Sequence, residues 1–223
     1  MLGSPKLRDS HLLKRPYPLG ELTEECLLSI CKSLAYQMAV GDKDLSGEKW
    51  EQIFAKGIEG INLSRPLGLA DVVKDSFSWS VKTLKVANPH KASKVRIISG
   101  RNNVNYSYGI ENPLEDIETT GEAVLSIFNE RLKTAKSEYK DLTHSILVRS
   151  PNFNEFTYFE KEAEIIDPKT ISWEKIKTVT YKVTILTRTT YIRGNPMEVN
   201  LQLFIKSLKT LFDSLLKTRK LRF

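Results

Sequence analysis

Cysteine and histidine are scarce in this chain of 223 residues, which has two cysteines and three histidines. Cys26 and Cys31 are five apart within a stretch of helical periodicity, so their side chains point in different directions and cannot form a disulfide without unwinding the helix. The histidines His11, His90 and His144 are scattered, with no zinc-type spacing to either cysteine. We therefore expect free thiols in a reducing cytoplasm, and no zinc site.

Long apolar runs are missing as well. Apolar stretches extend for only a few residues before a charge interrupts them, far short of the roughly 20 needed to span a bilayer. Residues 1–6 lack the apolar segment of a signal peptide, so neither a membrane partner nor secretion is expected. There is no internal repeat, low-complexity tract or long Pro/Gly/Ser linker. With 40% hydrophobic residues, the sequence predicts a globular protein with a single domain over residues 1–223.

Positive charge is concentrated in two segments of the chain, whose net charge is +7. Residues 62–110 carry 8 basic and 2 acidic side chains, and residues 168–223 carry 12 and 3, whereas residues 111–167 carry 6 and 13. If the two basic segments meet in the fold, they form a positive face that suits a polyanion, because contacts to phosphates are the usual source of such binding. Nucleic acid is thus the favoured partner, and a solvated basic tail is the alternative.

Apolar residues at helical spacing predict two helices near the start of the chain, the first over residues 21–39. The second is capped by Ser46 and carries Glu48 and Glu51 on one face. Further along, Thr119 and Glu122 have the pattern of a capping box that opens another helix. A last amphipathic helix is expected around residues 208–215.

Short strands are expected between these helices. Residues 69–73 and 78–84 flank a turn-like segment and are typical of a hairpin. Further strands are predicted at 95–99, 145–149 and 156–160 and within 179–193. The order of helices, hairpin, strand, helix and strands predicts an α/β (α+β) fold with a central mixed β-sheet flanked by helices, and the three tryptophans are expected in its core.

The predicted hairpin brings a carboxylate and a lysine together. Ser80 and Lys82 alternate along one strand and share a face, and the partner strand can place Asp71 beside them. Such a pair suits metal-assisted hydrolysis of a phosphodiester, in which the carboxylate holds Mg²⁺ and the lysine steadies or deprotonates the attacking water. One carboxylate rarely holds Mg²⁺ alone, and Ser80 does not supply the second. Ser80 is not expected to act as a nucleophile, because no histidine or second lysine is placed to serve it.

Asp71 followed by Ser80-Val81-Lys82 resembles the PD-(D/E)XK nuclease superfamily, in particular type II restriction endonucleases. The resemblance implies a restriction-endonuclease-like core over about residues 45–150, with Asp71 and Lys82 as catalytic residues and Glu51 or Glu48 as the acid contributed by the preceding helix. Ser80 stands at the family's acidic position and so is part of the catalytic triplet.

Two positions depart from the family's pattern. The serine resembles a variant that has the same Ser-Val-Lys triplet and recruits its second carboxylate from elsewhere in the chain. Glu122 is a further candidate for that carboxylate, although its predicted capping box already explains it. Ala70 stands where the family name implies proline.

Planar polar side chains in the two basic segments are candidates for DNA contacts, because guanidinium and amide groups reach phosphates and base edges. The segment that follows the predicted strand at 95–99 resembles the corresponding loop of restriction enzymes, and an ordinary surface loop is the alternative there. The candidates are Arg96, Arg101, Asn102, Arg188, Arg193 and Asn195.

The resemblance implies a Mg²⁺-dependent enzyme of the bacterial or archaeal cytoplasm that hydrolyses phosphodiester bonds of double-stranded DNA at specific sites. Residues 151–223 would add strands and help to recognise the target. A homodimer matches a palindromic site, and a DNA methyltransferase is the expected companion. Two alternatives stay open: a repair or mobile-element nuclease on the same core, and a non-catalytic DNA-binding protein on the same fold.

Overall fold

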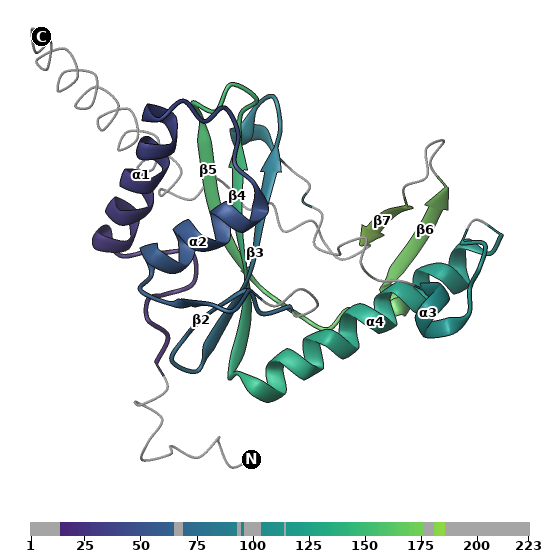
Figure 1. Cartoon of the computed structure of the whole chain (residues 1–223). Helices are drawn as coiled ribbons and strands as arrows, with labels where there is room; N and C mark the ends of the chain where they lie inside the picture. Colours follow the sequence, from purple (N-terminus) through teal and green to yellow (C-terminus); the bar gives the residue numbers. More distant parts are fainter. Residues whose placement is uncertain are drawn as a thin grey trace, which may run out of the picture.

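A computed structural model gives the structure of the chain (Figure 1). It describes residues 14–64, 69–92, 95, 104–113, 115–175 and 181–185. Of residues 170–175 and 181–185 only the backbone is described.

A five-stranded mixed sheet is the main feature of the described chain, with strand order β1-β2-β3-β4-β5. Its strands are β1 (Ile61–Asn62), β2 (Val72–Lys74), β3 (Phe77–Lys85), β4 (Asp141–Arg149) and β5 (Phe156–Glu162). Strands β3 and β4 pair parallel, whereas the other neighbours pair antiparallel. A separate antiparallel pair consists of β6 (Ile171–Lys175) and β7 (Tyr181–Ile185). The predicted mixed sheet is therefore confirmed.

Helices flank this sheet, as predicted. They are α1 (Glu24–Ala39), α2 (Gly47–Gly57), α3 (Val104–Tyr108) and α4 (Ile117–Glu138), with 3-10 turns at Pro89–Lys91 and Pro168–Thr170. Figure 1 shows α1 and α2 beside the main sheet, and α4 leading from it toward α3 and the β6–β7 pair. Among the described helices, none is both long and apolar enough to cross a bilayer.

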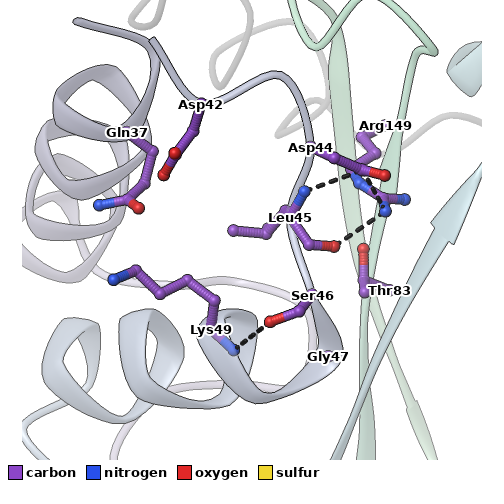
Figure 2. A pocket seen from close by; sticks show the side chains of 9 residues that line it. All are labelled: Gln37, Asp42, Asp44, Leu45, Ser46, Gly47, Lys49, Thr83 and Arg149. Atoms are coloured by element: carbon purple, nitrogen blue, oxygen red, sulfur yellow. Dashed lines mark hydrogen bonds and ion pairs between the residues drawn. The ribbon is translucent and has the colours of Figure 1, made fainter. Parts of the chain in front are cut away.

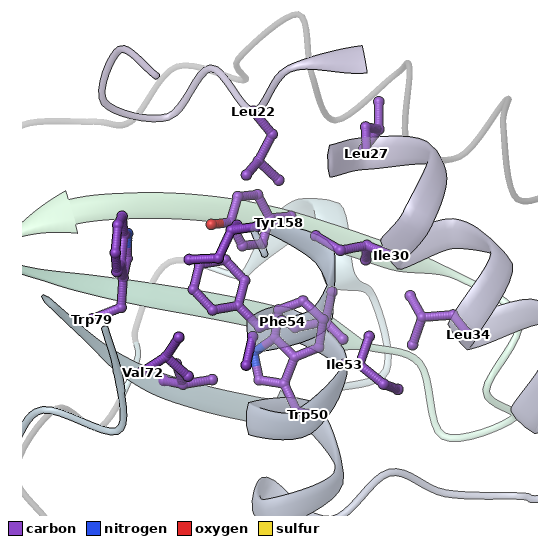
Figure 3. Packing of buried hydrophobic residues seen from close by; sticks show 14 of the residues in the cluster. Leu22, Leu27, Ile30, Leu34, Trp50, Ile53, Phe54, Val72, Trp79 and Tyr158 are labelled. Atoms are coloured by element: carbon purple, nitrogen blue, oxygen red, sulfur yellow. The ribbon is translucent and has the colours of Figure 1, made fainter. Parts of the chain in front are cut away.

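The two faces of the main sheet pack against different helices. On one face, side chains of α1 and α2 enclose a large aromatic and aliphatic cluster with Trp79 and Val72 (Figure 3). On the other face, Val73 and Leu142 pack with Phe128 and Leu132 of α4. Neighbouring strand residues such as Val72 and Val73 belong to different clusters because successive side chains point to opposite faces.

Several predicted elements are present. Helix α1 covers most of residues 21–39, and the Ser46 hydroxyl caps α2 by accepting from the backbone N–H of Lys49. The hairpin of β2 and β3 turns at Asp75, whose φ of 54° is one that aspartate tolerates. Trp50 and Trp79 are fully buried. Both cysteines are free, as predicted.

The predicted capping box is wrong. Helix α4 begins at Ile117, and its N-cap is Asp116, whose carboxylate accepts from the backbone N–H and the hydroxyl of Thr119. Aspartate is a strong N-cap residue, so Thr119 lies inside the first turn. Glu122 is an exposed residue further along α4, and the capping role assigned to it does not exist.

Other differences concern element lengths. Strand β2 begins at Val72, three residues after the predicted start at 69, and β4 begins at Asp141, four residues before its predicted start. Strands β1 and β6 were not predicted. The strand expected at 95–99 and the helix expected around 208–215 lie outside the described residues.

Candidate functional site

The backbone around Asp71 is fixed by two strands. Its N–H donates to the carbonyl of Trp79 on β3 at 2.8 Å, and its carbonyl accepts from the N–H of Leu63 at 2.9 Å. Val72 is the first residue of β2 and the register partner of Trp79, so Asp71 directly precedes the paired residues. Its contact with Lys82 Nζ places the Asp71 side chain on the face that carries Ser80 and Lys82.

The Asp71 carboxylate is held by two donors from β3. Its Oδ2 accepts from the backbone N–H of Val81 at 2.7 Å and from Lys82 Nζ at 3.1 Å. Lys82 Nζ also donates to the carbonyl of Val81 at 3.1 Å. The exposed fraction is 12% for the Asp71 side chain and 28% for that of Lys82. The structure thus brings the two residues together at a place where both side chains keep some contact with solvent.

Ser80 and His144 lie next to this pair on the same face of the sheet. They are register partners on the parallel strands β3 and β4, and both are buried. The ring of His144 stacks on Phe128 of α4, with ring centroids 6.4 Å apart. Neither Ser80 Oγ nor His144 Nδ1 has a hydrogen-bond partner in the part of the chain that the structure describes.

The environment of His144 favours a neutral ring. Burial is the largest cause that lowers its pKa to about 4, and the positive charges of Lys82 and Lys161 lower that pKa further. An imidazole with such a pKa is uncharged near pH 7, so one ring nitrogen has a lone pair. Lys82 therefore forms an ion pair with Asp71 and its charge also disfavours protonation of His144.

Sequence reasoning missed His144, because its strand was predicted to start one residue later. The pairing that brings it beside Ser80 joins segments far apart in the chain. A polar residue just before an apolar strand was the only signal in the sequence.

Glu48 and Glu51 lie on α2, which packs through Trp50, Ile53 and Phe54 on the face opposite to Ser80 and Lys82. Glu48 is exposed, and Glu51 is partly buried and engaged in an interaction of its own. Within the described ranges, there is no group of three or more His, Cys, Asp and Glu residues that could hold a metal ion. Their role as the second acid stays a prediction.

The predicted DNA contacts Arg96, Arg101, Asn102, Arg188, Arg193 and Asn195 all lie outside the described residues. Whether the two basic segments meet therefore stays a prediction too.

A second polar region lies on the other side of β3, in a cleft of about 600 Å³ at the start of α2 (Figure 2). Arg149 of β4 donates to the carbonyl of Leu45 at 2.8 Å and pairs with Asp44. Lys85 of β3 also pairs with Asp44, and its hydrogen bond is the main reason why the pKa of that carboxyl is lowered. These contacts tie the α1–α2 connection to the ends of two strands.

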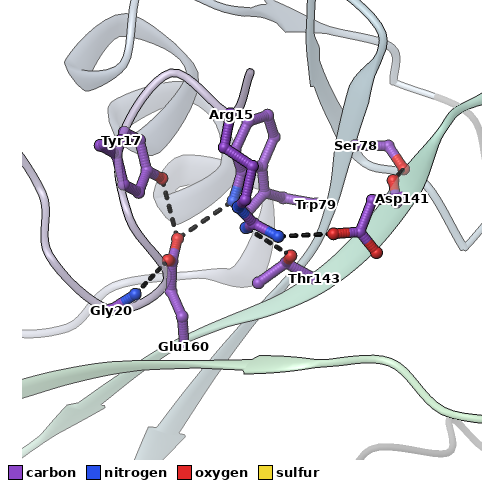
Figure 4. Close-up of polar contacts among 8 residues, drawn as sticks. All are labelled: Arg15, Tyr17, Gly20, Ser78, Trp79, Asp141, Thr143 and Glu160. Carbon is purple, nitrogen blue, oxygen red and sulfur yellow. Dashed lines mark hydrogen bonds and ion pairs between the residues drawn. The ribbon is translucent and has the colours of Figure 1, made fainter. Parts of the chain in front are cut away.

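A third polar cluster surrounds the buried carboxylate of Glu160 on β5 (Figure 4). Its oxygens accept from the hydroxyls of Tyr17 and Tyr158, from Trp79 Nε1 and from the backbone N–H of Gly20. Burial is the main reason why the pKa values of both tyrosines are raised, and the nearby Glu160 charge raises them further. Because every polar contact of this carboxylate is internal, we assign it a structural role.

Comparison with known proteins returned no protein family, no curated protein and no solved structure that matches the chain. The function has to be inferred from the residues of the site and their geometry.

Proposed function

We propose that this protein is a type II site-specific endonuclease, which hydrolyses phosphodiester bonds of double-stranded DNA with Mg²⁺ as cofactor and with Asp71 and Lys82 in the active site. The observation that carries the proposal is the distance of 3.1 Å between Lys82 Nζ and Asp71 Oδ2. The two residues come from adjacent antiparallel strands, with Ser80 on the same face. This arrangement supports the resemblance to the PD-(D/E)XK superfamily.

The donors present fit a magnesium ion that DNA would help to bind. Asp71 offers carboxylate oxygen at a partly exposed position, and Mg²⁺ usually keeps several waters and takes one or two carboxylates together with substrate phosphates. Such an ion, when bound, polarises the phosphate and lowers the pKa of a bound water. The buried atoms Ser80 Oγ and His144 Nδ1, which have no hydrogen-bond partner within the described residues, also fit a site that a bound ion completes.

Lys82 is positioned by its neighbours for a role in this chemistry. Its ammonium group has three donors, two of which are directed to Asp71 Oδ2 and the carbonyl of Val81. The third can orient the attacking water or contact a phosphate oxygen. Ser80 is a small neutral neighbour in this proposal. Glu51 and Glu48, predicted as the second acid, lie on α2 at the opposite face of the sheet, and the geometry adds no support for them.

The resemblance also supports proposals about partners. A homodimer would place one active site on each strand of a palindromic target. The basic residues 168–223 would take part in recognising the target. A DNA methyltransferase would protect the DNA of a bacterial or archaeal host, in whose cytoplasm both enzymes would work.

The proposal is tested by incubating the purified protein with unmethylated plasmid and phage DNA, in Mg²⁺ or in EDTA, and resolving the products on a gel. We expect discrete fragments in Mg²⁺ only. Lys82→Ala should lower cleavage by at least about 100-fold, as expected for loss of a group that handles a proton, and should retain DNA binding in a mobility-shift assay. Lys85→Ala is the matched control, because it removes a lysine from the same strand that pairs with Asp44 instead.

Cleavage that persists in Lys82→Ala would contradict the assignment of the site. Intact DNA together with a salt-sensitive mobility shift would favour the non-catalytic DNA-binding protein, the second candidate. The finding that no group of three potential metal ligands occurs in the described residues favours that candidate. Mg²⁺-dependent cutting without discrete fragments would instead favour a repair or mobile-element nuclease.

A further inference from the structure

Two buried polar atoms without partners lie side by side in the main sheet. Ser80 is fully buried and His144 is 2% exposed, and Ser80 Oγ and His144 Nδ1 have no hydrogen-bond partner in the described part of the chain. A buried polar group without a partner is unfavourable by about 1–3 kcal/mol. Such groups in a folded protein call for an explanation, and a bound ion or water is the usual one.

These two atoms continue a row that begins at Asp71. Asp71 contacts β3 through the backbone N–H of Val81 and through Lys82 Nζ, and Ser80 of β3 is the register partner of His144 on β4. Neighbouring strands are about 4.8 Å apart, so the backbones of Asp71 and His144 are separated by about 10 Å, with β3 between them. Apolar residues occupy other positions of this face, among them Val73 and Leu142.

We infer that His144 Nδ1 is a metal-binding donor of the Asp71 site and takes the place of the acidic side chain that Ser80 does not provide. The small side chain of Ser80 lies beside His144, and its hydroxyl would contact a water of the bound ion. This inference deepens the proposed function, since it concerns the cation of the same site. It does not depend on Glu51 or Glu48.

The donor set selects a class of metal ion. Carboxylate and water oxygens suit Mg²⁺ and Mn²⁺, whereas an imidazole nitrogen suits first-row transition metals. One carboxylate with one imidazole therefore favours Mn²⁺ or Co²⁺ over Mg²⁺. A carboxylate at position 80 would shift this preference toward Mg²⁺.

Mn²⁺ is the probe for the test, without DNA and with the full chain. We expect electron spin echo envelope modulation of bound Mn²⁺ to show coupling to one ¹⁴N nucleus. His144→Phe retains a ring for Phe128 to stack on and removes the nitrogen, so the coupling should vanish and the Mn²⁺ affinity should fall by at least about tenfold, since changes even outside the ligand shell weaken binding by 10- to 100-fold. His90→Ala is the control, because His90 is exposed and contacts Thr157.

A second variant covers the case in which His144→Phe does not fold. His144→Asn places an amide oxygen close to the position of Nδ1, so the nitrogen coupling should disappear while part of the Mn²⁺ affinity remains. Circular dichroism establishes that each variant is folded. Mn²⁺ bound without nitrogen coupling in the unaltered protein would overturn the inference, as would coupling that persists in the folded His144 variants.

The DNA-cleavage assay separates this inference from the proposed function. Nitrogen coupling from His144 in a protein that never cuts DNA would support the metal site and refute the nuclease. Mg²⁺-dependent cutting by a protein without that coupling would support the nuclease and refute the role of His144. If the role of His144 is refuted in this way, a buried water between Ser80 and His144 would satisfy their two polar atoms.

Discussion

Replacement of Glu160 is expected to destabilise the fold more than any other change of a single carboxylate on β5. The side chain is 8% exposed and accepts four hydrogen bonds. Three of them, from Tyr17, Trp79 and Tyr158, go to Oε1 at 2.7–3.0 Å. The fourth runs from the N–H of Gly20 to Oε2 at 2.9 Å. The carboxylate therefore ties the segment before α1 to β3 and β5.

The size of the effect follows from these four donors. In Glu160→Gln, the amide oxygen can keep the three donors at Oε1, but the amide NH₂ then faces the N–H of Gly20. Hydrogen bonds to a charged acceptor contribute about 1 kcal/mol more than neutral ones, and an unsatisfied buried donor costs about 1–3 kcal/mol. The relief of a buried charge offsets part of this sum, which leaves about 2 kcal/mol. Glu160→Ala leaves four buried donors without their acceptor and should cost about 4 kcal/mol, at about 1 kcal/mol for each donor.

Urea unfolding monitored by circular dichroism measures both values, provided that the m-values agree among the variants. Glu162→Gln is the matched control, since Glu162 is exposed on the same strand and its replacement should change the free energy of unfolding by less than about 0.5 kcal/mol. If Glu160→Gln is no more destabilising than Glu162→Gln, the four hydrogen bonds of Glu160 do not stabilise the fold.

Other predictions concern α1 and α2. Burial raises the pKa of the Cys31 thiol to about 12, so at pH 8 a thiol reagent should modify Cys31 only after unfolding. The half-buried Cys26 should react in the native protein, and rapid modification of both cysteines would contradict this. Gly57→Ala should destabilise by about 1–3 kcal/mol, because the added Cβ would lie 2.4 Å from Cγ1 of the buried Ile30. Gly47→Ala meets no atom within 4 Å and should be neutral or stabilising, and thermal unfolding of the two glycine variants measures the difference. Ser46→Ala removes the N-cap of α2 and should cost about 1 kcal/mol, measured by urea unfolding; an unchanged midpoint would refute the capping role.

The sequence predicts the part of the site that depends on local pairing. Asp71 and Lys82 are 11 residues apart, within one hairpin whose turn residues and alternation fix the register. Because the register decides which side chains share a face, the closeness of Asp71 to Lys82 could be inferred from the pattern alone. The helices α1 and α2 were likewise readable from apolar spacing and, for α2, from a capping serine.

The position of His144 could not be read in the same way. It depends on the parallel pairing of β3 with β4, which are joined through α3 and α4. Parallel strands need such a long crossover, and no local signal specifies which residue of the second strand faces Ser80. The start of α4 was predicted wrongly because two nearby residues, Asp116 and Thr119, can both cap a helix. The side-chain geometry of the folded protein decides between them, and there the Asp116 carboxylate accepts from Thr119.

A comparison of two buried serines, Ser80 on β3 and Ser145 on β4, tests whether buried hydroxyl groups in these strands stabilise the fold. Ser80 and Ser145 are both fully buried, but Ser145 Oγ donates to the hydroxyl of Tyr158 at 3.3 Å, whereas Ser80 Oγ has no partner in the described chain. Ser145→Ala should therefore destabilise by about 1 kcal/mol, and Ser80→Ala should stabilise by up to about 1 kcal/mol, since it removes a hydroxyl buried without compensation.

Both serine variants are measured by urea unfolding in EDTA, so that no bound cation stabilises either protein. If Ser80→Ala destabilises as much as Ser145→Ala, the Ser80 hydroxyl is satisfied within the fold, and its position beside Asp71 needs no functional explanation. If Ser80→Ala instead stabilises the protein, this serine lowers the stability of the fold. The ion pair of Asp71 and Lys82 beside it is mostly buried, so desolvation offsets much of its Coulomb attraction and it is weak evidence for a stabilising role. A buried hydroxyl that lowers stability, on a sheet face where apolar residues pack well, is then best explained by a ligand that it binds.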